Sequence, residues 1–204
     1  MKEIVTSLPG YKICQYQIVL NPHADLRIKV AELRNELNKK FKLTSPLGSK
    51  INLVLAVFTQ VEMMEKRIVD HLNTIGLGYP PFKVELKNFG SFPTHTIFIN
   101  MISKIPVRSL IKQIRSETQR LMKLNDENKP YFNTDPHIAI ARKLDPSQYE
   151  KAWLELSNKH FTGRFIADAM LLLKRYDGEK AWQILQRFDF KNLPVNVKQG
   201  DLFA

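Results

Sequence analysis

Apolar residues recur at helical spacing in several stretches of the chain, which predicts amphipathic helices. These stretches are residues 23–41, 60–76, 107–123 and 147–159. The third is the clearest, because an unbroken apolar stripe lies opposite a strongly basic face. Thr59 and Glu62 predict a capping box at the start of the second helix, and Asp145 followed by Pro146 predicts the start of the last.

Shorter apolar runs between these helices predict β-strands. They lie at residues 14–22, 51–58, 82–89, 95–102 and 137–144. Residues 165–190 predict a terminal hairpin, in which Asp177-Gly178 suits a type I′ turn. Because strands and helices alternate irregularly with hairpins among them, the sequence predicts an α+β fold with antiparallel sheets.

The strands at 52–58 and 137–143 form a weak internal repeat. Since side chains alternate along a strand, each segment has one face with a polar first residue and mostly small residues after it. These faces are Asn52, Val54, Ala56 and Phe58, and His137, Ala139, Ala141 and Lys143. The opposite, aliphatic faces are expected beneath helices. Arg142 falls on one of them, so a groove role for it requires a bulge or a strand end and is disfavoured. The small faces leave room for a groove, although two short buried strands can share this pattern by chance.

Charge is the one unusual feature of the composition. The 204 residues include 31 Lys plus Arg and 20 Asp plus Glu, a net charge of +11. Such an excess favours polyanionic partners such as RNA, DNA, nucleotides or an acidic protein, unless the surface is merely basic. The chain has a single cysteine, Cys14, and it has neither an apolar signal segment nor a run of about 18 apolar residues. These features predict a cytoplasmic protein outside the membrane.

The two repeat strands resemble the motifs of a known family. The 2H phosphoesterases, also called the 2′-5′ RNA ligase-like family, carry two His-x-Thr/Ser motifs on two related strands. "PHIAIAR" at 136–142 matches the second motif and "SKINLVL" at 49–55 aligns with the first, at a similar separation. His137 is in place, whereas Asn52 replaces the first histidine, and Val54 and Ala139 replace the hydroxyl residues. The segment before the second strand and the terminal hairpin are also similar to the family.

The resemblance implies a single domain over residues 1–204 with motif strands at about 51–58 and 137–143. Two pseudo-symmetric lobes would have antiparallel sheets that form a concave groove, with helices on the outer faces. In active members the two histidines act as general base and general acid, and the hydroxyls bind phosphate oxygens. The family's substrates are 2′,3′-cyclic phosphates, 2′-5′ linkages and RNA ends, and it uses neither metal nor cofactor.

Much of this chemistry is missing from the chain. Asn52 can donate a hydrogen bond but cannot exchange a proton near neutral pH, and a positioned acid or base is typically worth about 10²–10⁴-fold in rate. Val54 and Ala139 offer no hydrogen bond to phosphate. The resemblance therefore implies a degenerate site, with His137 as the one signature group able to carry a proton.

Binding can survive these losses. Lys50 and Lys143 are candidates to flank the groove, Phe58 to stack on a base, and His137 to donate to phosphate. Each has a structural alternative: the lysines as solvated charges, Phe58 as core, and Asn52 with His137 as a polar pair across the groove.

These observations favour a 2′-5′ RNA ligase-like protein that binds RNA or a nucleotide phosphate rather than cleaving it. One alternative is a residual cyclic-nucleotide or RNA phosphodiesterase that uses His137 alone. Another is a protein-interaction scaffold whose basic face meets an acidic partner. The sequence does not decide among them and leaves the oligomeric state open.

Overall fold

Residues 11–43, 47 and 50–194 are described by the computed structural model, and they contain two antiparallel β-sheets. The five-stranded sheet has the order β5-β2-β1-β8-β9, and the four-stranded sheet has the order β6-β4-β3-β7. The strands are β1 (Ile13–Leu20), β2 (Leu53–Val61), β3 (Phe82–Phe92), β4 (Thr96–Met101), β5 (Tyr131–Phe132), β6 (Ile138–Arg142), β7 (Thr162–Ala167), β8 (Ala169–Tyr176) and β9 (Gln183–Asp189). The predicted α+β fold with antiparallel sheets is confirmed.

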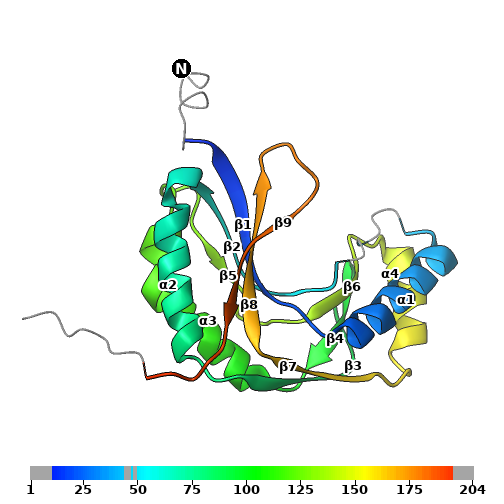
Figure 1. The fold of residues 1–204 in the computed structure, drawn as a ribbon. Helices are drawn as coiled ribbons and strands as arrows, with labels where there is room; N and C mark the ends of the chain where they lie inside the picture. The colour runs from blue at the N-terminus through cyan, green and yellow to red at the C-terminus, as the bar shows by residue number, and fades with distance from the viewer. Residues whose placement is uncertain (1–10, 44–46, 48–49, 195–204) are drawn as a thin grey trace, which may run out of the picture.

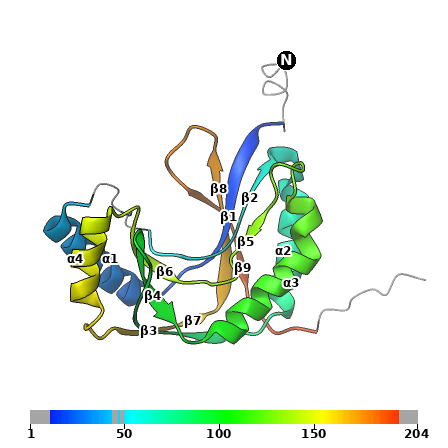
Figure 2. The ribbon, with the colours of Figure 1, turned by 180° about the vertical axis from the view of Figure 1, so that it is seen from behind.

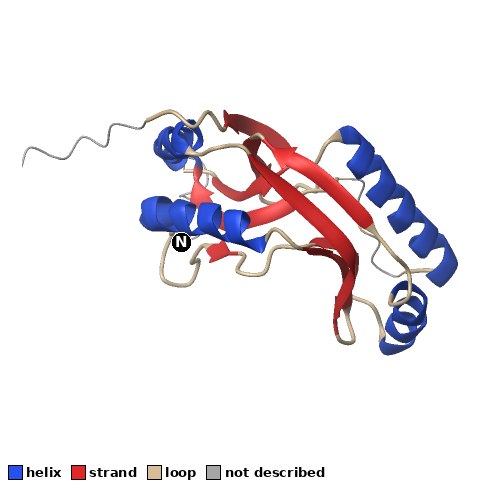
Figure 3. Ribbon diagram, turned by 90° about the horizontal axis from the view of Figure 1, so that it is seen from below, coloured by secondary structure: helices blue, strands red, loops and turns tan. Residues whose placement is uncertain are grey.

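The helices lie on the outer sides of the two sheets. They are α1 (Ala24–Phe41), α2 (Glu65–Gly78), α3 (Lys104–Met122) and α4 (Pro146–Leu156). α2 and α3 cover the five-stranded sheet, and α1 and α4 cover the four-stranded sheet (Figures 1 and 2). From below, the strands lie between the two helix pairs (Figure 3), so the predicted two-lobed architecture is also confirmed. Within the described ranges, no helix combines the length and apolarity needed to cross a bilayer.

The predicted start of α4 is confirmed, whereas that of α2 is wrong. The Asp145 carboxylate accepts from the Gln148 backbone N–H at 2.7 Å, and the Gln148 side chain accepts from the Asp145 N–H at 3.3 Å, which completes a capping box. Thr59, by contrast, still belongs to β2, and α2 begins only after the 3₁₀ turn η1 (Glu62–Met64). The Glu62 carboxylate accepts from Lys174 Nζ at 2.6 Å and is engaged away from the helix end.

The terminal hairpin is formed by β8 and β9 alone, while β7 pairs with β3 in the other sheet. A six-residue loop, 177–182, joins the two hairpin strands. Its first turn has a positive φ only at Gly178 (82°), and the Glu179 N–H donates to the Tyr176 carbonyl at 3.1 Å. A type I′ turn needs positive φ at both central residues, so the predicted Asp177-Gly178 turn is wrong.

Each motif strand carries one β-bulge at the same place in the repeat. Where β2 pairs with β1, Leu55 is the extra residue, and where β6 pairs with β4 it is Ile140. Leu55 comes three residues after Asn52 and Ile140 three residues after His137. The shared position supports the internal repeat, because an extra residue at a fixed place re-aims all later side chains of a strand.

The bulges reverse the expected faces beyond these points. Ala56 and Phe58 turn into the core, where they are 0% and 3% exposed, and Phe58 stacks on Tyr16 with ring centroids 4.9 Å apart. The prediction that Phe58 faces the groove is therefore wrong. Ala141 is buried in the same way. Strict alternation predicts that Arg142 points toward the helices, but its side chain lines the groove instead.

Replacing Phe58 with Ala is expected to lower the free energy of unfolding by about 3–5 kcal/mol, because it removes a buried ring stacked on Tyr16. Tyr131→Ala is the matched control, since that ring on the adjacent β5 is 59% exposed. Urea denaturation measures both. Equal, small losses in the two variants would contradict the core position of Phe58.

Candidate functional site

A pocket of about 190 Å³ lies between the two motif strands, and we refer to it as the central pocket. Asn52 and Val54 line it from the first motif, His137 and Ala139 from the second, and Lys50 at its edge. The remaining lining residues are Gln17, Arg34, Leu47, Asn133, Arg142, Leu173 and Trp182. The structure thus brings together the predicted site residues except Phe58 and Lys143. Lys143 follows the end of β6 at a φ of 54°, and it is not among the lining residues.

Asn133 fastens the segment that leads to His137 onto the first motif strand. Its backbone N–H donates to the Leu55 carbonyl and its side-chain Nδ2 to the Val54 carbonyl, both at 2.9 Å. Its Oδ1 accepts from the Asp135 N–H at 3.2 Å. Through these bonds the position of His137 depends on the strand that follows Asn52.

The His137 ring is held between a hydrogen bond and two aromatic rings. Its Nδ1 lies 2.8 Å from the Asp135 carbonyl oxygen, and its centroid lies 4.6 Å from that of Phe98 and 5.3 Å from that of Phe92. A carbonyl can only accept, so Nδ1 carries the proton. In the neutral ring, Nε2 is then the nitrogen with a lone pair, as a general base requires.

Burial lowers the pKa of His137 below its ordinary value, because desolvation disfavours the charged ring. The positive charges of Arg142 and Lys104 act in the same direction, while the hydrogen bond to the Asp135 carbonyl and the charge of Asp135 oppose it. His137 is therefore expected to be neutral at neutral pH, and a negative charge in the pocket would favour its protonation.

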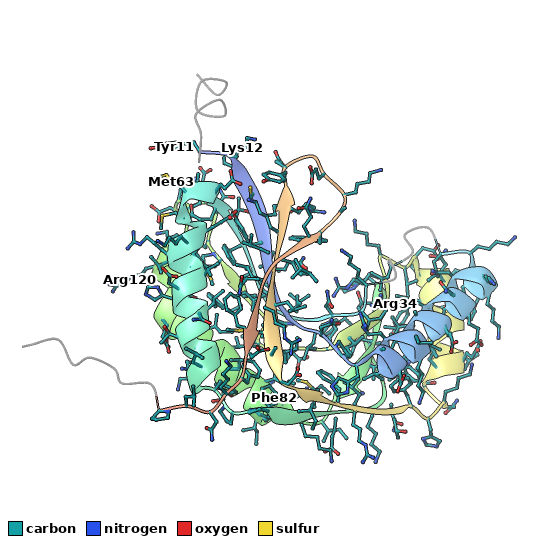
Figure 4. The ribbon with its side chains drawn as sticks, in the orientation of Figure 1. Tyr11, Lys12, Arg34, Met63, Phe82 and Arg120 are labelled. Atoms are coloured by element: carbon teal, nitrogen blue, oxygen red, sulfur yellow. The ribbon has the colours of Figure 1, made fainter. Side chains whose placement is uncertain are left out.

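Arg34 supplies a buried positive charge from α1 (Figure 4). It is 6% exposed, and its Nε and Nη2 donate to the Ala139 carbonyl at 3.2 and 2.7 Å, while Nη1 donates to the Lys50 carbonyl at 3.2 Å. Burial lowers its pKa to about 10, with a contribution from Arg142, so the guanidinium stays charged at neutral pH. The sequence analysis missed Arg34, although its spacing from Val30 and Leu37 places it on the buried stripe of α1.

Arg142 brings a second guanidinium to the central pocket. Strict alternation puts it on the aliphatic face, but the bulge at Ile140 and its place at the strand end turn it into the lining. After burial, its charge contributes to the lowered pKa of both Arg34 and His137. The expectation that Arg142 has no groove role is thus wrong.

Lys50 links the rim of the central pocket to the β8–β9 loop. Its Nζ donates to the Trp182 carbonyl at 2.5 Å, and the Trp182 ring lies 4.6 Å from the Arg175 guanidinium. Both Lys50 and Trp182 are among the residues that line the pocket.

The central pocket has the charge distribution of an anion site. Arg34, Arg142 and Lys50 line it, and none of its described lining residues carries a carboxylate. Across the described part of the chain, no group of three or more His, Cys, Asp or Glu side chains is arranged to hold a metal ion. The arrangement favours an anion held by direct contacts with protein cations.

A family model described as "2'-5' RNA ligase superfamily" matches residues 21–179. The chain belongs to the 2′-5′ RNA ligase superfamily. It is also 24% identical over 184 residues to a Bacillus licheniformis protein that is named as a phosphoesterase, covering 85% of this chain and 97% of that protein.

Solved structures of the same fold include two bacterial proteins. TT0787 of Thermus thermophilus has 16% identity and a TM-score of 0.64, over 87% of this chain and 98% of its own. Escherichia coli LigT in complex with 3′-AMP has 15% identity and a TM-score of 0.66, over 88% of this chain and 99% of its own. LigT has also been solved with phosphate.

Residues of both motif strands that the resemblance identifies lie together in the central pocket. His137 and Asn52, which the resemblance aligns with the two histidine positions, both line the central pocket. Val54 and Ala139 line the pocket where the resemblance places hydroxyls. Arg34 and Arg142 instead provide positive charge close to that position.

In the free protein, His137 is expected to titrate below its ordinary pKa of about 6.5. Because the unfolded chain then binds this proton more readily, His137 should reduce stability as the pH falls from its unfolded pKa toward its folded pKa. NMR titration of the His137 ring measures its pKa. Arg142→Gln should raise it by removing a nearby positive charge, whereas Arg120→Gln on the outer face of α3 should leave it unchanged. A titration at or above the ordinary value would contradict the buried neutral ring.

Proposed function

We propose that this protein binds the phosphate group of a nucleotide or an RNA end in the central pocket and does not cleave it at a useful rate. The observation that supports this most is the cluster of Arg34, Arg142 and Lys50 between the two motif strands, with no carboxylate among the described lining residues. The complexes of LigT with phosphate and 3′-AMP support a nucleotide phosphate as the anion.

The three cations contribute differently to this binding. Arg34 is held by the Ala139 and Lys50 carbonyls and acts as a fixed positive charge. Arg142 is exposed at a strand end, where its planar guanidinium can donate two parallel hydrogen bonds to phosphate. Lys50 is exposed, and its Nζ donates to the Trp182 carbonyl, a contact that an anion can replace.

His137 adds a pH-dependent contact. While neutral, it presents a lone pair at Nε2, which repels a phosphate oxygen, and after protonation it donates a hydrogen bond instead. Anion binding therefore couples to proton uptake, and affinity rises as the pH falls toward and below the pKa of the bound ring.

Catalysis requires a second proton carrier, and Asn52 cannot act as one. A residual phosphodiesterase is the second candidate function, because a neutral His137 with a basic Nε2 is in the protonation state of a general base. Without a partner acid and without the hydroxyls, such a reaction is expected to be slow.

Replacing Arg142 with Gln is expected to weaken sulfate binding by about 10- to 100-fold, the effect of losing a hydrogen bond to a charged group. Sulfate is the probe because its charge stays constant between about pH 5 and pH 8, so any pH dependence reports on His137. The fluorescence of Trp182 in a Trp153→Phe background measures binding. Arg120→Gln, an exposed arginine on α3, is the control and should bind like the parent. Equal affinity of the Arg142 variant and the control would contradict an anion site here.

Turnover of a 2′,3′-cyclic nucleotide and of a 2′-5′-linked dinucleotide at high protein concentration separates binding from catalysis. We expect no turnover by the natural chain and recovered turnover in an Asn52→His/Val54→Thr/Ala139→Thr variant, because the layout of the motifs is intact. Turnover by the natural chain that His137→Ala abolishes would establish the phosphodiesterase instead. Inactivity of both chains, together with absent anion binding, would favour a protein-interaction scaffold.

A further inference from the structure

β7 (Thr162–Ala167) is the last strand of the four-stranded sheet and pairs with β3 on one side only. The pairing runs over six consecutive residue pairs without a register shift. In Figure 1 the strand runs along the lower side of the molecule. A regular edge strand presents main-chain groups to which another extended chain can bond.

The other edge strands in the described part of the chain are less suited to such bonding. β5 has only two residues, and β6 and β9 each carry a bulge. The Ala139 carbonyl of β6 is also bound by Arg34. Short strands, bulges and covering contacts all hinder the addition of a further strand. β7 is longer than β5 and has no bulge, so it is the edge best suited to strand addition.

Two hydrogen bonds show which main-chain groups at this edge point outward. The Phe161 carbonyl accepts from the Asn88 N–H at 2.7 Å, so residue 161 is bonded inward, toward β3. The Thr162 carbonyl instead accepts from Lys29 Nζ of α1 at 3.0 Å and points outward. Because inward and outward bonding alternates along an antiparallel strand, every second residue after Thr162 also points its N–H and C=O groups outward.

These next outward-pointing residues are Arg164 and Ile166. Within the described ranges, no side chain or loop bonds to their N–H and C=O groups. A pocket of about 310 Å³ is lined by Arg164, Phe165 and Ile166 in succession, together with Lys83 and His23. Since consecutive side chains of a strand point to opposite faces, a space that touches all three borders the edge of the strand.

The side chains beside this edge leave one positive charge unpaired. Arg164 lies opposite Glu85 in the β3–β7 register, but the Glu85 carboxylate lies 2.6 Å from Lys83 Nζ. Arg164 is exposed and forms no ion pair with any described residue. Ile166, two residues along on the same face, is 45% exposed. An added strand would therefore meet a cation and an aliphatic side chain on one face.

We infer that the edge of β7 binds an extended segment of a partner protein by strand addition. In antiparallel pairing, the segment carries an aliphatic residue opposite Ile166 and, two residues later, an acidic residue opposite Arg164. The residue between them points to the other face of the sheet. This interaction does not use the central pocket and is independent of the proposed function.

A second copy of β7 fits this edge less well than an acidic segment. Antiparallel pairing through Arg164 and Ile166 of both strands places the two Arg164 side chains diagonally across the seam, on one face. Like charges at that spacing repel, and the net charge of +11 adds repulsion between whole copies. The charge therefore favours an acidic partner over self-association.

The probe is a labelled synthetic peptide, acetyl-Ser-Thr-Ile-Thr-Glu-Thr-Ser-amide, whose binding is measured by fluorescence anisotropy. Arg164→Glu should weaken its binding by about fivefold or more, because an opposite-charge pair across the strands becomes a like-charge pair. A peptide with Lys in place of Glu should show the reverse preference. Arg120→Glu on α3 is the matched control, since it makes the same change in net charge at another exposed arginine.

Main-chain pairing is tested separately from charge. Methylating the N–H of the peptide's Ile or Glu, which face β7, should weaken binding by about tenfold or more, whereas methylating the Thr between them should have little effect. Ile166→Pro removes an outward N–H and leaves the bonds to β3 in place, so it should bind more weakly than Ile166→Ala.

Equal effects of methylation at Glu and at the central Thr would overturn strand addition, as would absence of binding at the highest protein concentration reached. Equal binding of the Glu and Lys peptides by the natural chain would overturn the acidic character of the partner. A dimer in sedimentation velocity that Ile166→Pro dissociates and Ile166→Ala does not would assign the edge to a second copy and overturn the partner inferred here.

Discussion

The site depends on one buried cation. Arg34 donates to the carbonyls of Ala139 and Lys50, and so ties α1 to the second motif strand and to the segment that enters the first. A buried guanidinium is costly unless its N–H groups are paired, and these carbonyls supply three of its hydrogen bonds. The same interaction that joins the motifs therefore leaves a permanent positive charge between them.

This charge changes what the groove can do. In the family that the chain belongs to, the resemblance assigns phosphate binding to hydroxyls beside two proton carriers. Here Val54 and Ala139 are apolar, and the positive charge comes from Arg34 and Arg142. The charges of the two arginines favour an anion in the pocket, while burial, with a contribution from Arg142, lowers the pKa of His137. Under the proposed function, anion binding and protonation of His137 are therefore linked through one pocket.

The sequence predicted the architecture better than the details of the site. The helical stripes, the antiparallel sheets and the pairing of Asn52 with His137 in one pocket follow from periodicity and from the resemblance. Phe58 and Arg142 were placed on the wrong faces because strict alternation cannot anticipate a bulge, and nothing in the local sequence marks Leu55 or Ile140 as the extra residue. The predicted capping box at Thr59 is wrong because of a long-range contact: the Glu62 carboxylate accepts a hydrogen bond from Lys174.

Asn133 has a consequence for how such a protein can evolve. It holds the His137 segment against β2 through the carbonyls of Val54 and Leu55, so the bonds involve main-chain atoms of the first motif and not its side chains. A substitution of the Val54 side chain, which lines the pocket, therefore leaves both hydrogen bonds in place. The bonds that join the two motif strands and the side chains that line the pocket are thus different sets of atoms, so the lining can change while the strands stay joined.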